Sequence, residues 1–250
     1  SEMFFQQLQQ AFQHRFTEDQ QSLVEKLSDF LFHQPETKVF IIDGYAGTGK
    51  TGLMSALVKV LPFYSIKTIL LAPTGRAAKV LSRNSQKTAS TIHKHIYYSS
   101  IDTNGNISLK LKNNKNTSTL YIVDEASMIG AREQGFEAHN LLDDLLQHCL
   151  SGYKNKVIFM GDTAQLPPIG SSTSPALKQE YLETEFALTT QYQRLTQVVR
   201  QALQSGILRN ASNIRWAIAN GRIRLPILKT KDLNDVRIVE AYDLEDTLRS

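Results

Sequence analysis

Short apolar runs alternate along the chain with amphipathic segments whose apolar residues recur every three or four positions. The continuous apolar runs predict buried strands at residues 39–43, 68–72, 120–123 and 157–160. Helical spacing is found at residues 4–15 and 18–32, and in leucine-rich stretches that end before Pro62 and Gly152. Apolar strands that alternate with helices predict an α/β fold, in which a central parallel sheet is covered by helices on both faces.

Residues 97–118 break this rhythm. Asn104-Gly105 lies between two segments in which apolar and polar residues alternate. This is a strong local signal for a β-hairpin, because Asn-Gly suits the tight turn between paired strands. We therefore expect a small antiparallel hairpin inserted into the parallel domain.

The composition changes after Leu188, where glutamine and arginine become frequent. Residues 194–219 have the spacing of a helix, and residues 236–241 that of a further strand. These patterns predict three parts. Residues 1–96 and 119–220 form the main domain, and residues 97–118 form the inserted hairpin. Residues 221–250 form a linker and the start of a second domain.

Composition excludes several classes of protein. Of the 250 residues, 41% are hydrophobic and 21% charged, which is ordinary globular usage and excludes wholesale disorder. The single cysteine, Cys149, excludes an intrachain disulfide and indicates a reducing, cytoplasmic location. No apolar run approaches the ~20 residues of a membrane-spanning helix, so we expect no membrane partner. The net charge of +4 allows an anionic partner.

The clearest chemical motif is a phosphate-binding loop. Gly44-Tyr45-Ala46-Gly47-Thr48-Gly49-Lys50-Thr51 matches G-x-x-x-x-G-K-[ST] in full, after a predicted strand and before a predicted helix. Its glycines let backbone N–H groups surround phosphate oxygens, and the following helix start favours anions. We expect ATP to bind here, with Lys50 at the β- and γ-phosphates and Thr51 on Mg²⁺. The alternative is a glycine-rich turn that binds nothing.

An acidic pair follows the apolar run at residues 120–123. In an enzyme with a phosphate loop, Asp124 would hold Mg²⁺, and Glu125 would orient or deprotonate the attacking water. The alternative is a helix cap, because acidic residues often follow strands and begin helices.

A third segment carries a family resemblance. Val157-Ile-Phe-Met-Gly161-Asp162-Thr-Ala-Gln165-Leu-Pro-Pro168 resembles motif III of superfamily 1 helicases, and with Asp124-Glu125-Ala-Ser it is most similar to the RecD-like and Dda-like 5′-to-3′ group. Further motifs of that group are matched in order by Ala72-Pro-Thr74-Gly-Arg76-Ala-Ala-Lys79, Ser90-Thr91-Ile-His93 and Leu195-Thr-Gln-Val-Val-Arg200-Gln. The resemblance covers roughly residues 17–215. It extends to exodeoxyribonuclease V alpha-type proteins, although the sequence contains no evident nuclease metal cluster.

The resemblance implies a RecA-like P-loop ATPase domain, the N-terminal motor of an ATP-dependent DNA helicase. Such a motor, which we expect to act as a monomer, couples Mg-ATP hydrolysis to translocation on single-stranded DNA and to duplex unwinding. The implied catalytic residues are Lys50, Asp124, Glu125, Gln165 and Arg200. Gln165 would sense the γ-phosphate, although its segment also has the composition of a plain turn. Arg200 would be the arginine finger; a solvated helix-surface arginine is the alternative, and Arg194 is a nearby rival.

Gln20 has two interpretations. Phe16-Thr-Glu-Asp-Gln20 resembles the helicase motif in which a glutamine reads the adenine edge, and Gln21 would take that place in a register one residue longer. Thr17-x-x-Gln20 also fits a helix capping box, in which the glutamine side chain turns back to its own helix start.

The resemblance also implies a nucleic-acid face. Thr74, Arg76, Thr91 and His93 would contact single-stranded DNA, since hydroxyls and cations at helix starts suit phosphate oxygens. The alternative for His93 is an ordinary, partly buried histidine. Related helicases carry a strand-separating pin where residues 97–118 lie, and its lysines would favour a phosphate backbone. The alternative is a solvated surface hairpin.

Nothing in the sequence resembles helicase motifs V and VI, so we expect the chain to be the front part of a longer helicase. Two other functions stay open. One is a P-loop NTPase of another class, such as a nucleotide kinase. The other is a single-strand-binding module without catalysis.

Overall fold

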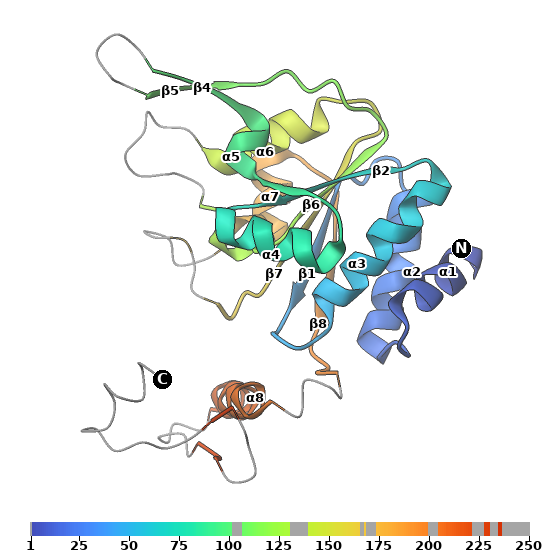
Figure 1. The fold of residues 1–250 in the computed structure, drawn as a ribbon, viewed down its shortest axis with the longest axis vertical. Helices are drawn as coiled ribbons and strands as arrows, with labels where there is room; N and C mark the ends of the chain where they lie inside the picture. Colours follow the sequence, from blue (N-terminus) through green and yellow to red (C-terminus); the bar gives the residue numbers. More distant parts are fainter. Residues whose placement is uncertain are drawn as a thin grey trace. The chain divides into compact units, whose positions relative to one another are not determined.

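The computed structural model describes residues 2–101, 107–130, 140–165, 168, 174–199, 205–221, 228–230 and 235–236. The chain divides into two compact units. The first comprises Ser1–Tyr45 and Gly49–Gln197, and the second comprises Ala46–Thr48 and Val198–Ser250. The first unit contains the sheet and its covering helices (Figure 1).

The first unit is built on a six-stranded sheet with the order β3-β2-β6-β7-β1-β8, in which all neighbouring strands are parallel. The strands are β1 (Val39–Gly44), β2 (Lys67–Ala72), β3 (Ala89–Thr91), β6 (Thr119–Val123), β7 (Lys156–Gly161) and β8 (Thr190–Leu195). Strands β1 and β6 are buried along their whole length, as expected for a parallel sheet with both faces covered. The predicted α/β class is confirmed.

Alternating side chains of the strands enter two separate cores. On one face, Phe40, Ile42 and Ile122 pack with helices from the N-terminal half. These helices are α1 (Glu2–Phe12), α2 (Glu18–Phe32), α3 (Lys50–Val60) with its 3₁₀ extension η1 (Leu61–Tyr64), and α4 (Gly75–Ser85). On the other face, Ile41 and Val123 pack with α5 (Ile92–Ile96), α6 (Leu141–Leu150), η2 (Ala126–Met128), η3 (Pro175–Leu177) and α7 (Gln179–Phe186). The result is a three-layer RecA-like α/β domain (Figure 1).

The inserted hairpin is confirmed. Strands β4 (Tyr97–Ile101) and β5 (Ile107–Leu111) pair antiparallel, with Tyr97 opposite Leu111. The expected turn residues, Asn104-Gly105, lie outside the described residues. Strand pairing ends at Leu111, and residues 112–118 then lead back to β6. Tyr97 is buried and donates to Asp144 Oδ2 (2.5 Å), so it packs in the domain, whereas Tyr98 is 63% exposed.

A polar cluster fixes the segment that returns from the hairpin. Asn114 Nδ2 donates to the His148 carbonyl oxygen (2.8 Å), and the Lys112 carbonyl oxygen lies 2.8 Å from His148 Nδ1. The rings of His95 and His148 meet edge to face, with centroids 5.4 Å apart. Burial lowers the pKa of both imidazoles, and that of His95 falls to about 4. Burial in this cluster therefore favours the neutral form of both histidines.

Acidification is expected to destabilise this unit through His95. Its pKa in the folded state, about 4, lies below the ordinary value of 6.5, so folding favours the neutral ring. The resulting stability is complete above pH 6.5 and is lost as the pH falls toward 4. We expect the melting temperature to fall by roughly 2–5 °C between pH 7 and pH 5, measured by circular dichroism. In a folded His95→Gln variant this slope should be shallower; an unchanged slope would contradict the assignment.

Two sequence expectations about secondary structure need correction. The helix expected over residues 194–219 is wrong at its start, because Arg194 and Leu195 end the strand β8 and the helix α8 is Gly206–Ala219. Strand β8 reads Thr-Gln-Tyr-Gln-Arg-Leu and lies at the sheet edge, where pairing with β1 outweighs the local polar composition. The first helix ends at Phe12, short of the expected residue 15, because Gln13 adopts a left-handed φ of 64°.

The second unit contains α8, which starts with a hydrogen bond from the Leu208 N–H to Ser205 Oγ (3.3 Å). Asp235 supports the same helix start by accepting from Ser205 Oγ and the Gly206 N–H, each at 2.7 Å. The strand expected at 236–241 lies outside the described residues from 237 onward. None of the helices in the described ranges combines the length and the apolarity needed to cross a membrane.

Candidate functional site

The phosphate loop joins β1 to α3 at the carboxyl edge of the sheet. Gly47 and Gly49 have φ values of 82° and 83°, a left-handed conformation that glycine adopts without steric cost. Gly49 immediately precedes α3 and, as a glycine, has no side chain with which to cap that helix start. The first N–H groups of α3 are therefore available to an anion. In the second unit, the Val199 N–H donates to the Gly47 carbonyl (3.0 Å).

Lys50 is the first residue of α3, and its ammonium group turns back into the loop. Its Nζ donates to the carbonyl oxygens of Gly44 and Tyr45, at 3.0 Å in the second case. Burial lowers the pKa of Lys50, while four surrounding carboxylates oppose that shift: Asp162, Asp124, Asp43 and Glu125. The structure thus places one cation among the acidic residues of three different strand ends.

The acidic pair follows β6. The Asp124 N–H donates to the Leu71 carbonyl (3.0 Å), and Asp124 Oδ1 accepts from the Glu125 N–H (2.9 Å). Glu125 has a left-handed φ of 55°, and its side chain makes no capping hydrogen bond to η2 among the described residues. The helix-cap alternative is therefore not formed by Glu125. Burial raises the pKa of both carboxyls, and the Asp124 charge raises that of Glu125 further. A raised pKa suits a group that must accept a proton.

The loop after β7 contains Asp162 and Gln165. The Asp162 carbonyl accepts from the Gln165 N–H (3.0 Å), and Asp162 Oδ1 accepts from the Ala164 N–H (2.9 Å). These bonds make a tight turn that leaves the Gln165 side chain exposed. Leu166, Pro167 and residues 169–173 lie outside the described residues, as does Arg200.

Sequence reasoning missed a buried carboxylate directly before the phosphate loop. Asp43 is 1% exposed. Its Oδ1 accepts from the Thr163 N–H (2.9 Å), and its Oδ2 accepts from Thr163 Oγ1 (2.8 Å) and Tyr192 Oη (3.0 Å). Arg194 Nε lies 3.5 Å from the same Oδ2. The available signal was an acidic residue at the end of the run Val39-Phe-Ile-Ile, where a buried charge needs partners.

The start of α2 shows the capping box that the sequence allowed. The Gln20 side chain is fully buried, and its Oε1 accepts from the Thr17 N–H (3.0 Å) while Thr17 Oγ1 accepts from the Gln20 N–H (3.3 Å). The neighbouring Asp19 accepts from the N–H groups of Thr196 (2.6 Å) and Gln197 (3.0 Å). Sequence reasoning missed this link, which joins α2 to the chain after β8.

The residues expected to contact DNA lie at the carboxyl ends of β2 and β3, two neighbouring strands. Thr74 and Thr91 are helix caps: their Oγ1 atoms accept from the N–H groups of Ala77 (3.2 Å) and Lys94 (3.3 Å). Arg76 is exposed, and His93 is half-buried with its ring 5.7 Å from that of Tyr97. These side chains share the carboxyl edge of the parallel sheet with the phosphate loop.

The oxygen donors at this edge fit Mg²⁺. The Thr51 hydroxyl and the Asp124 carboxylate are hard ligands, and Mg²⁺ in nucleotide sites takes one or two protein ligands together with phosphate oxygens. Within the described ranges, no three His, Cys, Asp or Glu side chains gather in a metal-binding group.

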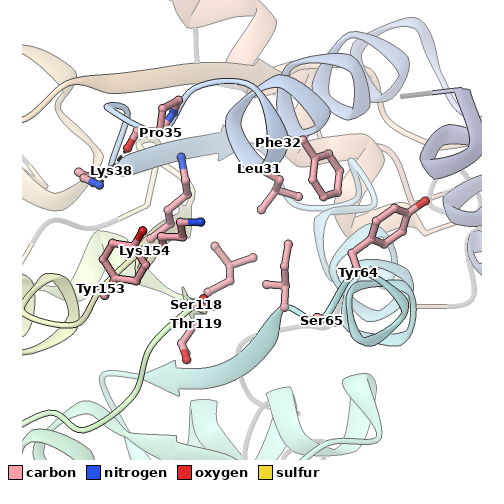
Figure 2. Close-up of a pocket in the computed structure, with 13 residues that line it drawn as sticks. Leu31, Phe32, Pro35, Lys38, Tyr64, Ser65, Ser118, Thr119, Tyr153 and Lys154 are labelled. Atoms are coloured by element: carbon pink, nitrogen blue, oxygen red, sulfur yellow. Dashed lines mark hydrogen bonds between the residues drawn. The ribbon is translucent and has the colours of Figure 1, made fainter.

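A cavity of about 610 Å³ lies at the opposite edge of the sheet, beside the starts of β6 and β7 (Figure 2). Its lining includes Lys38, Lys154 and Lys156. Lys156 Nζ donates to three backbone carbonyls, those of Phe30, Gln34 and Thr37, at 2.6–2.7 Å. We interpret Lys156 as a structural link between α2 and β7, and this cavity shares no lining residue with the phosphate loop.

Comparison with known proteins places these features in a family. Residues 15–241 match the model of the AAA domain family. The chain is 29% identical over 198 residues to the ATP-dependent RecD2 DNA helicase of Deinococcus radiodurans. This alignment covers 79% of this chain and 24% of that protein. The chain is 33% identical over 181 residues to an uncharacterized protein of Acanthamoeba polyphaga mimivirus, covering 64% of this chain and 35% of the relative. The chain thus spans about a third or less of these relatives.

Among solved structures, the Pif1 helicase from Candida albicans matches 75% of this chain and 41% of its own, with a TM-score of 0.47 and 17% identity. The large terminase of bacteriophage HK97 matches 95% of this chain and 48% of its own, with a TM-score of 0.47 and 13% identity. At these TM-scores the similarity supports no conclusion about function. On the family match and the ordered motifs, the chain belongs to the AAA domain family and is a RecD-like P-loop domain of the superfamily 1 helicase type.

Proposed function

We propose that this domain binds Mg-ATP and hydrolyses it in response to single-stranded DNA, as the motor of a DNA helicase. The observation that carries the proposal is the position of the Lys50 ammonium among Asp124, Glu125 and Asp162 at the carboxyl edge of the sheet. A fixed cation beside Asp124 and Glu125, whose pKa values are raised by burial, is suited to phosphoryl transfer, in which charge must be placed around the γ-phosphate.

Each residue has a separate role in this proposal. Lys50 and the α3 N–H groups hold the phosphates, and Thr51 and Asp124 hold Mg²⁺, which supplies charge neutralisation when it is bound. Glu125 takes a proton from the attacking water. Gln165, exposed in its turn after β7, responds to the γ-phosphate, and Arg200 acts as the arginine finger.

The adenine contact proposed for Gln20 requires a local change. Its Oε1 is engaged by the Thr17 N–H, and the side chain is buried. Reading the adenine edge through this amide would require release of the capping box, whereas Gln21 is exposed on the first turn of α2.

For the nucleic-acid side, we propose that single-stranded DNA follows the carboxyl ends of β2 and β3, at Thr74, Arg76, Thr91 and His93. The hairpin offers a further contact, since Tyr98 is exposed and the ammonium of Lys112 lies 5.2 Å from the centre of its ring. Such a pairing of aromatic and basic side chains suits a single strand. The name of the RecD2 relative supports DNA as the substrate.

The proposal is tested by ATP hydrolysis with and without a poly-dT strand of about 30 nucleotides. We expect a low basal rate that rises at least about fivefold when the strand is present, the size of an ordinary coupling between two ligand sites. Phosphoryl transfer to an added nucleotide would favour a nucleotide kinase instead. DNA affinity that is the same with and without Mg-ATP, together with no ATP hydrolysis, would favour a single-strand-binding module.

A further inference from the structure

Three segments that are distant in sequence meet at the Asp43 carboxylate. Asp43 is the penultimate residue of β1 and directly precedes Gly44, where the phosphate loop begins. Thr163 reaches it from the loop after β7 with both its N–H and its hydroxyl group. Tyr192 reaches it from β8, the strand on the other side of β1. These contacts hold the three segments together, because each donor that is lost leaves a buried charge less well compensated.

The Thr163 contact bears directly on Gln165. Thr163 is held twice by Asp43, and the turn from Asp162 to Gln165 is closed by its own backbone hydrogen bond of 3.0 Å. A shift of the β1 end would therefore reach a short, closed turn through Thr163, and only Ala164 lies between that anchor and Gln165.

The Arg194 contact ties β8 to the phosphate loop in the same way. Its Nε lies 3.5 Å from Asp43 Oδ2, and its Nη2 donates to Tyr45 Oη (3.0 Å). The guanidinium carbon also lies 5.3 Å from the centre of the Tyr45 ring. Tyr45 is the second residue of the loop, so Arg194 bridges the carboxylate before the loop and a side chain within it.

We propose that Asp43 is a positioning residue that makes the turn at Thr163–Gln165 and the end of β8 move together with the phosphate loop. The inference rests on the proposed function and deepens it, since it names the connection through which nucleotide binding reaches Gln165. Asp43 does not contact the nucleotide in this scheme; it acts through Thr163 and Arg194.

A fluorescent label on the turn tests this connection. Cys149 is fully buried, and burial raises the pKa of its thiol, so it reacts slowly. Ala164 is exposed in the turn, so an Ala164→Cys variant can be labelled selectively with an environment-sensitive maleimide dye. We expect Mg-ATP to change the emission of this labelled protein.

The Asp43→Asn change in the labelled protein should reduce that response at least about fivefold, with ATP affinity within about threefold. Asparagine can still accept the Thr163 N–H, but its amide nitrogen cannot accept from Thr163 Oγ1 and Tyr192, and it faces the Arg194 cation. Asp29→Asn, at an exposed carboxylate of α2, is the matched control and should leave the response unchanged. Thr163→Val removes a donor at an exposed position and should reduce the response as Asp43→Asn does.

The outcomes separate the two proposals. If calorimetry detects no ATP binding to the Ala164→Cys protein, the proposed function is overturned, and the coupling with it. If ATP binds but the dye does not respond, or responds equally in Asp43→Asn and Thr163→Val, only the coupling is overturned. A fall in ATP affinity as large as the fall in response would make Asp43 a structural support of the loop and would also overturn it.

Discussion

Replacing Lys50 with alanine is expected to lower ATP affinity about 100-fold or more while the fold is retained, because charged contacts to phosphate are among the strongest in proteins. The ammonium lies among Asp162, Asp124, Asp43 and Glu125. Without this ammonium, no cation of the loop would offset the repulsion between these carboxylates and the phosphates of ATP. The fold should survive, since burial disfavours the Lys50 charge in the first place.

Isothermal calorimetry with Mg-ATP measures this effect. Lys59→Ala is the matched control, because Lys59 is exposed near the other end of the same helix, α3. It removes the same charge from the chain without touching the loop. Unchanged affinity in a folded Lys50→Ala protein would show that the loop does not hold the phosphates.

Replacing Glu125 with glutamine should separate binding from chemistry. The amide keeps the size of the side chain but cannot accept a proton from water, so we expect ATP hydrolysis to fall about 10²- to 10⁴-fold. ATP affinity should stay within about threefold, since Lys50 and the α3 N–H groups are unchanged. Single-turnover hydrolysis and calorimetry measure the two quantities. Glu180→Gln, at an exposed position of α7, is the control.

The pH dependence of hydrolysis gives an independent check on Glu125. Burial and the neighbouring Asp124 raise its pKa above the ordinary 4.5. A base must be deprotonated to act, so the rate should fall as the pH drops through this raised pKa. For the substitution itself, hydrolysis at the wild-type rate in the Glu125→Gln protein would mean that another group accepts the proton from water.

The sequence alone determined the parts of this protein that depend on neighbouring residues. The apolar runs predicted β1, β2, β6 and β7, and the phosphate loop lies where its motif requires, between a strand and a helix. The hairpin followed from a local turn signal, and the capping box of α2 from Thr17-x-x-Gln20. These features are local because a strand, a turn or a cap is decided within a few residues by backbone geometry and burial.

Only the tertiary structure decided which distant residues meet. Asp43 and Thr163 are 120 positions apart, and Asp19 and Thr196 are 177 apart, yet each pair is hydrogen-bonded. Strand β8 is polar and has no strand pattern of its own; pairing with β1 makes it a strand and brings Arg194 beside the phosphate loop. The physical reason is that parallel strands place their carboxyl ends at the same edge of the sheet, while the order of the strands in the sheet differs from their order in the chain. The side chains that meet at this edge therefore come from distant segments, and a local sequence pattern cannot show that these segments are neighbours.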